Sequence, residues 1–221
     1  MYICVWYMGF CNRHLKPFIS GYAPTMNKYD AYKQDLQFQV DLKGHSLSFR
    51  TTWGLFCPEH IDDGSRLLLE YVNVNPYDSV LDVGCGYGAI GLPLAKQAAH
   101  GIVHLIDKDF VAVEYAKRNA VENGIHNVEV YLSNGLSHVP SIQFDVIVSN
   151  LPAKVSNELF YILFHDIKNC LRPQGRLYVV TINGLREYIK RTFRDIFGTY
   201  DKLKQGASYT VAATTKQPDE N

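Results

Sequence analysis

Residues 79–91, with the sequence S-V-L-D-V-G-C-G-Y-G-A-I-G, indicate the fold more clearly than any other part of the chain. Their first half is apolar and rich in valine, which predicts a buried strand ending at Val83. Three glycines at alternate positions follow, and glycine allows positive φ and close approach of a ligand to the backbone. A helix expected to begin near Ala89 would point its free N–H groups at that loop. This order is typical of the nucleotide-binding edge of a parallel α/β sheet.

The frame of the glycines narrows the choice of cofactor. Residues 86–91 match the G-x-G-x-x-G pattern of dinucleotide-binding loops. Because the strand is expected to end at Val83, however, Gly84 is the first glycine of the loop and Gly86 the second, which gives a G-x-G-x-G loop. Asp82 precedes this loop, and a buried carboxylate is costly without partners, so we expect Asp82 on the cofactor side. This frame argues against a nicotinamide site.

Strands and helices alternate along the rest of the chain. Alternating apolar and polar residues predict a β-hairpin over residues 36–50. The strands expected after it are 79–83, 102–107, 127–132, 144–149 and 175–181, followed by a closing pair, 199–204 and 207–214. The expected helices are 66–72, 89–99, 109–123, 156–171 and 184–197. This order predicts a doubly wound, mostly parallel α/β sheet of seven strands, and the tight turn at residues 205–206 requires an antiparallel last strand.

Composition limits the possible classes of protein. A chain of 221 residues, 47% hydrophobic and 20% charged, is expected to form one globular domain. Its formal net charge is zero, so nucleic acid would have to bind a local patch. Five cysteines without a C-x-x-C pair favour reduced thiols in the cytoplasm. We expect no metal site, because the histidines are dispersed, and no membrane span, because the apolar run 1–10 is too short.

The block L-D-V-G-C-G-Y-G, residues 81–88, closely resembles the first motif of the class I S-adenosylmethionine (SAM)-dependent methyltransferases. Over residues 36–214 the likeness is closest to the "small" methyltransferase domain family, which includes ribosomal RNA guanine-N2 methyltransferases. Residues 61–69 resemble that family's D-x-G-[ST]-x-L-L segment, and residues 171–177 resemble its segment before the fifth strand. The resemblance implies SAM as the cofactor and a Rossmann-like fold with a reversed last strand.

We expect three parts in the chain. Residues 1–25 are interpreted as an extension outside the core, with a partner-binding arm as the alternative. Residues 26–214 would form the SAM-dependent methyltransferase domain, and residues 215–221 a disordered tail. Large RNA-modifying members of the family carry a second, duplicated domain. We expect this chain to be a stand-alone catalytic domain instead, which recruits its substrate as a homodimer or through its N-terminal segment.

Residues at the ends of two later strands complete the predicted cofactor site. Asp107 lies 23 residues after Gly84, where an acidic side chain can accept hydrogen bonds from both ribose hydroxyls, and Lys108 follows it. Asp107 could instead cap the next helix, although Asp109 is the better cap. Asn134 follows the third strand, and the resemblance implies that it meets the adenine edge. A plain turn residue before glycine is the alternative there.

The next strand ends in N-L-P-A, residues 150–153, beside the glycine loop. This sequence resembles the N-P-P-aromatic motif of amino-methyltransferases, with Pro152 as the second proline. The resemblance implies that the side-chain oxygen of Asn150 and the carbonyl of Leu151 accept hydrogen bonds from the target amine and align its nitrogen with the methyl group. An ordinary strand-ending turn is the alternative. We expect Asn150→Asp to be milder than Asn150→Ala, because an acceptor remains.

The chain departs from this motif at two positions. Leu151 replaces the first proline, so a carbonyl acceptor remains but the loop is less rigid. Ala153 replaces the aromatic residue, so the ring that would stack on a flipped base is missing. A planar substrate would therefore need another platform, for which Trp53, Phe56 and Tyr87 are the candidates.

Basic residues within positions 183–204 are a weaker indication of RNA binding: Arg186, Lys190, Arg191, Arg194, Lys202 and Lys204. They could form a phosphate-binding face, although a solvated helix surface is commoner. The leading hypothesis is a SAM-dependent N-methyltransferase that acts on an exocyclic amine of guanine in RNA, most of all ribosomal RNA. The alternatives are a SAM enzyme for a small molecule or a protein amide, and a SAM-binding partner subunit without activity.

Overall fold

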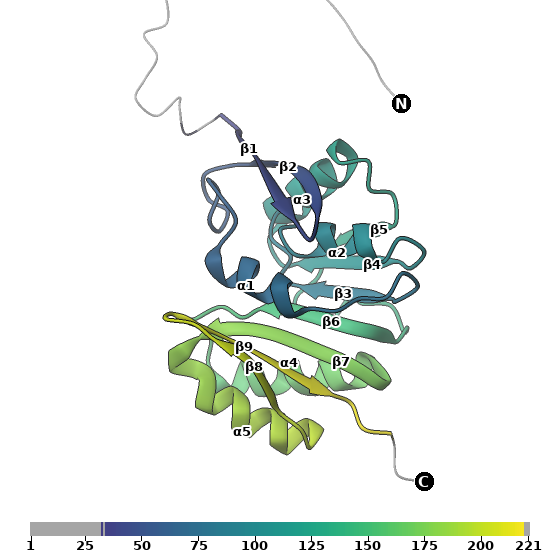
Figure 1. Cartoon of the computed structure of the whole chain (residues 1–221), viewed down its shortest axis with the longest axis vertical. Helices are drawn as coiled ribbons and strands as arrows, with labels where there is room; N and C mark the ends of the chain where they lie inside the picture. The colour runs from purple at the N-terminus through teal and green to yellow at the C-terminus, as the bar shows by residue number, and fades with distance from the viewer. Residues whose placement is uncertain (1–31, 33, 219–221) are drawn as a thin grey trace, which may run out of the picture.

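The computed structural model describes residue 32 and residues 34–218, so the predicted extension 1–25 lies outside the described residues. These residues form a two-stranded antiparallel sheet and a seven-stranded sheet with helices on both faces (Figure 1). The small sheet consists of β1 (Leu36–Leu42) and β2 (His45–Thr51), paired from Leu36↔Thr51 to Leu42↔His45. The predicted N-terminal hairpin is therefore confirmed.

The large sheet has the strand order β5-β4-β3-β6-β7-β9-β8. Its members are β3 (Val80–Val83), β4 (Val103–Asp107), β5 (Val128–Leu132), β6 (Phe144–Asn150), β7 (Leu171–Ile182), β8 (Asp201–Gln205) and β9 (Tyr209–Thr215). β3 to β7 pair in parallel, whereas β9 is antiparallel to both of its neighbours. The predicted doubly wound sheet with an antiparallel last strand is confirmed. Because β9 runs backwards, it begins at the edge where the parallel strands end.

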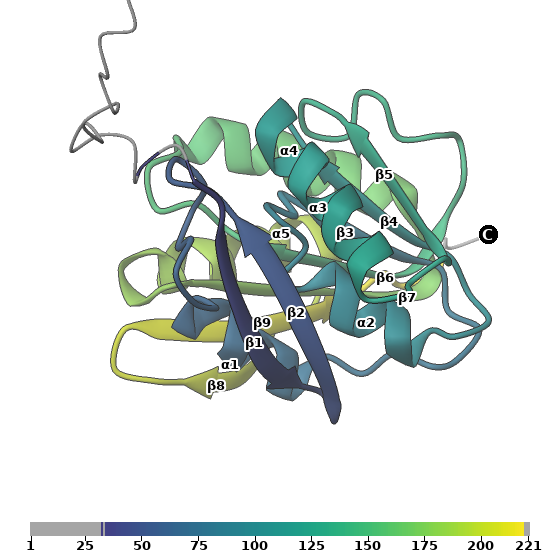
Figure 2. The ribbon, with the colours of Figure 1, turned by 90° about the horizontal axis from the view of Figure 1, so that it is seen from above.

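Among the described residues, five helices cover the two faces of this sheet. α1 (Asp63–Tyr71), α2 (Gly91–Gln97) and α3 (Phe110–Glu122) share one apolar cluster with one face, and α4 (Asn157–Cys170) and α5 (Arg186–Phe197) share another with the opposite face. A short 3-10 turn, Asn183–Leu185, precedes α5. The hairpin lies outside the first helical layer, toward the viewer in Figure 2. Most residues that the strands of the large sheet contribute to these clusters are valine, leucine or isoleucine, as expected for parallel strands buried on both faces.

Two asparagines of the α3 region hold the hairpin on the domain. The Asn119 side chain accepts from the Arg50 amide at 2.8 Å and donates to the Arg50 carbonyl at 3.0 Å. One turn later, Asn123 makes the same pair of hydrogen bonds with Ser48, at 2.9 and 2.7 Å. The two side-chain amides thus pair with backbone N–H and C=O groups of β2, as a neighbouring strand would. This fixes the hairpin above the glycine loop, because Asn119 also donates to the carbonyl of Tyr87.

Several element boundaries differ from those expected. α1 begins at Asp63 instead of Arg66, because Asp62 caps it by accepting from the Ser65 amide. α2 is shorter than the expected 89–99. β7 is longer, because it pairs with β6 already at Leu171 and crosses an irregularity before residue 176.

The C-terminal boundary also needs a correction. Thr215, expected in a disordered tail, belongs to β9, and Lys216 is buried with its backbone paired to Gly175. The domain therefore extends beyond residue 214. In the part of the chain that the structure describes, no helix is long and apolar enough to cross a membrane, and no group of His, Cys, Asp and Glu side chains could hold a metal ion.

Candidate active site

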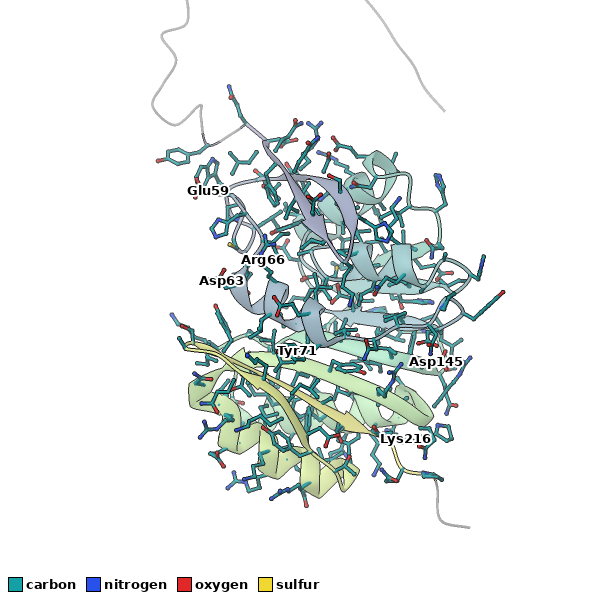
Figure 3. The ribbon with its side chains drawn as sticks, viewed as in Figure 1. Glu59, Asp63, Arg66, Tyr71, Asp145 and Lys216 are labelled. Carbon is teal, nitrogen blue, oxygen red and sulfur yellow. The ribbon has the colours of Figure 1, made fainter. Side chains whose placement is uncertain are left out.

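The predicted site residues gather at the edge where the parallel strands end. The side chains labelled in Figure 3 mark the two edges of the sheet: Glu59, Asp63 and Arg66 lie toward this one, and Asp145 and Lys216 toward the other. β3 and β6 are neighbours, with Asp82 opposite Val148. Asn150, two residues further along β6, is thus level with Gly84. The glycine loop and the N-L-P segment therefore lie side by side, as their sequence patterns require.

The glycine loop adopts a conformation that only glycine takes without strain. Gly84 and Gly86 have φ of 76° and 55°, and a Cβ added to either would meet no atom within 4 Å. The loop therefore borders open space. Cys85 between them is buried, and burial raises the pKa of its thiol well above the ordinary value. It packs as a neutral apolar side chain.

Asp82 is fully buried beneath this loop. Its Oδ2 accepts from the Gly91 amide at 2.8 Å, which ties the first turn of α2 to β3. Its Oδ1 has no hydrogen-bond partner among the described residues. Burial raises the pKa of Asp82 to about 7; the Gly91 N–H opposes this rise and nearby Asp107 adds to it. The structure thus gives Asp82 a role in shaping the loop, and one helix N–H expected to face a ligand is already occupied.

Asp107 braces the glycine loop from the end of β4. Its Oδ2 accepts from the Gly86 amide at 2.9 Å and its Oδ1 from the Asp109 amide at 2.9 Å. Asp109, not Asp107, caps α3. Each carboxylate oxygen of Asp107 has a further lone pair, and the side chain is only half-buried, so it can still accept from ribose hydroxyls.

Lys108 and Asn134 are both exposed beside Asp107. Asn134 follows β5, and the Ser133 amide donates to the Asp107 carbonyl, which brings the ends of β4 and β5 together. Gly135 next to it has φ of 56° and faces open space. The structure therefore brings together the predicted ribose and adenine residues along one continuous rim.

Asn150 is held in a single orientation. Its Nδ2 donates to Asp62 Oδ2 and to Ser65 Oγ, both at 2.9 Å. Its Oδ1 has no hydrogen bond from the described residues, so the amide presents an acceptor. The next residue, Leu151, has a buried side chain and donates its amide to the Val180 carbonyl. This anchors the loop although the motif's first proline is missing, while Pro152 and Ala153 are exposed.

Sequence reasoning missed Asp62 and Ser65 as site residues. They are 88 and 85 positions away from Asn150. The D-D-G-S sequence could have indicated this contact. A carboxylate that caps a helix and has small neighbours can also reach a second hydrogen-bond partner.

The three predicted stacking residues have different environments. Phe56 is 69% exposed and Trp53 36% exposed, so both can contact a ligand. Tyr87 is only 4% exposed, and its hydroxyl donates to the carbonyls of Cys57 and His60 at 3.2 and 3.1 Å. The prediction that Tyr87 could be a stacking platform is therefore wrong: its ring packs under the hairpin and anchors the loop before α1.

The basic residues of α5 are partly neutralised. Arg186 pairs with Glu187 at 3.0 Å, Lys190 approaches the same carboxylate at 3.9 Å, and Arg191 lies over the Tyr188 ring. Such contacts are ordinary for a solvated helix face. The alternative that we considered commoner from the sequence thus describes this helix better than a phosphate-binding face.

Comparison with known proteins identifies the family. Residues 46–213 match the methyltransferase small domain, which is well over half of the chain. The chain belongs to the methyltransferase small domain family. The uncharacterized protein YbxB of Bacillus subtilis strain 168 is 36% identical over 150 residues, covering 67% of this chain and 74% of YbxB.

Two RNA methyltransferases are also similar to this chain. Ribosomal RNA small subunit methyltransferase C of Enterobacter sp. strain 638 is 32% identical over 190 residues, covering 84% of this chain and 53% of that protein. The solved structure of the T. thermophilus 16S rRNA N2 methyltransferase RsmC with AdoMet and guanosine superposes with a TM-score of 0.73 and 26% identity, covering 82% of this chain and 50% of that one. This chain spans about half the length of the RNA methyltransferases it matches.

The site fits the cofactor of this family, which is SAM. The two open glycines leave room above the loop for the methionine part. Asp107 and Asn134 offer acceptors and donors along the same rim, where ribose and adenine would lie. Asn150 is level with Gly84, beside the place where a sulfonium on this loop would lie. Gly84, Gly86, Asp107, Lys108, Asn134 and Asn150 are the residues that would hold the cofactor. Asp82, which the sequence also suggested, is fully buried beneath the loop and braces it instead.

Proposed function

We propose that this protein is a SAM-dependent N-methyltransferase that acts on the exocyclic amine of a guanine in RNA, most of all in ribosomal RNA. The observation that carries the proposal is the orientation of Asn150. Its amide nitrogen is engaged by Asp62 and Ser65, so its oxygen remains to accept from an amine at the edge of the glycine loop. The similarity to ribosomal RNA methyltransferases supports guanine in RNA as the target.

The chemistry divides between cofactor and protein. When bound, SAM supplies a methyl group on a positively charged sulfur. The protein has to place a nitrogen lone pair in line with that methyl group. Two hydrogen bonds from the target –NH₂, one to Asn150 Oδ1 and one to the Leu151 carbonyl, would fix the plane of the amine. Such alignment supplies much of the rate of a direct displacement, and no strong base is needed if the proton leaves after attack.

The base itself would need an apolar contact. Ala153 offers no ring, whereas Phe56 and Trp53 are exposed on the loop that leads to α1. We propose that these two side chains contact the substrate. Because Ala153 is exposed and carries no ring, the site could also take a small molecule or a protein amide. The experiment below distinguishes these substrates from RNA.

The proposal is tested by mass spectrometry of nucleosides from wild-type cells and from cells lacking the protein. A lower content of N2-methylguanosine in the RNA, restored by the wild type but not by Asn150→Ala, is the expected result. Label transfer from SAM to protein or to metabolites, with RNA unlabelled, would support the alternative substrates. No label in any fraction would favour a partner subunit without activity. Calorimetry should show binding of S-adenosylhomocysteine and none of NADH.

Location and assembly remain proposals of the same kind. We propose a cytoplasmic protein, since its cysteine pattern favours reduced thiols. Homodimer formation stays a prediction that light scattering on the purified full chain will test.

A further inference from the structure

The carboxylate of Asp62 connects three segments that are far apart in the sequence. Its Oδ2 accepts from the Ser65 amide at 3.0 Å and from Asn150 Nδ2 at 2.9 Å. Its Oδ1 accepts from the Tyr209 hydroxyl at 3.1 Å. The side chain is 8% exposed, so these hydrogen bonds are largely shielded from water. We call Asp62, Ser65 and Tyr209 the Asn150-holding cluster.

The topology of the sheet explains how the cluster forms. Asp62 lies just before α1, Asn150 ends β6, and Tyr209 begins β9. β9 is antiparallel and pairs Tyr209 with Ile182, while the parallel strand β6 pairs Asn150 with Val180. The reversed strand therefore starts at the edge of the sheet where β6 ends, on the other side of β7.

Gly64 provides a second, independent observation. A Cβ at this position would lie 2.9 Å from Asp62 Oδ2 and 3.1 Å from the Tyr209 ring. Both distances are too short for an ordinary contact, so a side chain here would push the carboxylate and the ring apart. The close approach of the three segments thus depends on a glycine inside the D-D-G-S sequence.

Helix capping alone does not explain the cluster. A capping residue needs one oxygen on the amide of the third residue, which is the Ser65 contact. The contacts to Asn150 and Tyr209 are additional. Burial, followed by the nearby Asp62 charge, raises the pKa of the Tyr209 phenol, so it stays protonated and donates. The carboxylate has only acceptor atoms, so it dictates which end of the Asn150 amide faces it.

We propose that Asp62 is a positioning residue, which fixes the Asn150 amide so that its oxygen faces the target amine, with Ser65 and Tyr209 in support. The inference rests on the proposed function, because it assigns the acceptor role to Asn150 Oδ1. If the amide turned over, its oxygen would lie against the Asp62 carboxylate, and its NH₂ would meet the NH₂ of the substrate. A freely turning amide would therefore spend much of its time in an unproductive state.

The test compares Asp62→Ala with Asp62→Asn and with a matched control, Asp63→Ala. Asp63 is the neighbouring carboxylate in the first turn of α1; it is exposed and has no contact to Asn150 among the described residues, and Figure 3 labels it. Label transfer from SAM to in vitro transcribed ribosomal RNA gives kcat and KM, and calorimetry gives the affinity for S-adenosylhomocysteine. Thermal unfolding reports on the loss of the cap.

Asp62→Ala should lower kcat on the order of 10²-fold, with cofactor affinity little changed. Asp62→Asn should stay within a few-fold of wild type, because an amide oxygen can replace Oδ2 and the Tyr209 hydroxyl can turn to accept. Asp63→Ala should keep the wild-type kcat. In an Asn150→Ala background, Asp62→Ala should lower kcat no further, since its effect acts through the missing amide.

Each outcome discriminates. An Asn150→Ala variant with full activity overturns the proposed function, whereas an inactive Asn150→Ala with a fully active Asp62→Ala overturns only the positioning role. If Asp62→Ala lowers kcat further in the Asn150→Ala background, Asp62 acts independently of Asn150 and the positioning role is overturned. A readout without activity is the side-chain NH₂ signal of Asn150 in ¹⁵N NMR of the full chain. Its two shifts should change in Asp62→Asn and Tyr209→Phe, and unchanged shifts in both would overturn the hydrogen-bonded cluster.

Discussion

Replacing Asn150 by aspartate should abolish methyl transfer near pH 8 and restore part of it as the pH falls. From the residue type alone the change looks mild, because a hydrogen-bond acceptor remains. In the structure the reverse holds, because Asn150 Nδ2 lies 2.9 Å from Asp62 Oδ2. The variant would place a carboxylate oxygen where the donor was, against another carboxylate that is largely buried.

The magnitude follows from the geometry. Two unit charges about 4 Å apart repel by about 4 kcal/mol at an effective dielectric constant of about 20. The hydrogen bond from Nδ2 to a charged acceptor is lost as well, at a cost of about 1.5–3 kcal/mol. The repulsion is relieved when the introduced aspartate side chain turns away from Asp62 or when the two carboxyl groups share one proton. About 4 kcal/mol corresponds to roughly a thousandfold loss of the productive geometry, and hence of kcat, when both groups are ionised.

The shared proton gives the Asn150→Asp variant a distinctive pH profile. When the introduced carboxyl group is protonated, it can donate to Asp62 and keep its carbonyl oxygen toward the amine, as the asparagine does. Activity relative to wild type should therefore rise as the pH falls, because two carboxylates that share a site hold one proton more tightly than an isolated carboxylate does. The assay is the initial rate of label transfer from SAM, with calorimetry of S-adenosylhomocysteine as the control for the fold.

A second variant separates charge from shape. Adding Asp62→Asn to Asn150→Asp removes one of the two charges and should recover about tenfold or more of the rate at pH 8. If Asn150→Asp alone turned over at near the wild-type rate at pH 8, the carboxylate of Asp62 would not face residue 150, and the reasoning would fail.

Four further predictions address the rest of the site. Asp82→Asn should be more stable than wild type at pH 8, by up to about 4 kcal/mol, and the difference should shrink toward pH 4. The reason is that folding raises the pKa of Asp82 from 3.8 to about 7, so the wild type loses stability as the pH rises between these values. Urea unfolding at both pH values measures the difference. Asp107→Ala should weaken S-adenosylhomocysteine binding by about 1–3 kcal/mol in calorimetry, since the Gly86 amide and the ribose both lose an acceptor. Trp53→Ala with Phe56→Ala should raise KM for RNA and leave cofactor affinity unchanged; an unchanged KM would remove both from the substrate site. Ala153→Phe should keep or raise the rate on a base, and a loss on RNA would argue for a bulkier, non-planar substrate.

The glycine loop was predictable because its signal is local. Strand, loop and helix follow one another within residues 79–91, and positive φ at Gly84 and Gly86 is a property of the residue type. The spacing from Gly84 to Asp107 is likewise fixed by one helix and one strand of standard length. A mostly parallel sheet of seven strands with a reversed final strand followed from the alternation of strands and helices and from a tight turn, whereas the order of the strands in the sheet came only from the structure.

Contacts between distant segments were not predictable in this way. Tyr87 looked available for stacking because it lies in the cofactor loop, yet Phe38 and Phe49 of the hairpin enclose its ring. No residue near Tyr87 in the sequence indicates that the hairpin folds over it. The asparagines that hold the hairpin there belong to the α3 region, about thirty residues later. The contact between Asp62 and Asn150 also joins distant segments, because it depends on how α1 and the end of β6 are placed relative to each other.

The loop before α1 connects the glycine loop to Asn150. The Tyr87 hydroxyl, which belongs to the glycine loop, donates to the carbonyls of Cys57 and His60. That loop leads within two residues to Asp62, whose carboxylate holds Asn150. Burial raises the pKa of the Tyr87 phenol, so it remains a donor across the working pH range. The burial of Tyr87 therefore has a consequence that the sequence did not suggest: the glycine loop, where SAM would bind, is tied to the segment that holds Asn150, the residue proposed to orient the substrate amine.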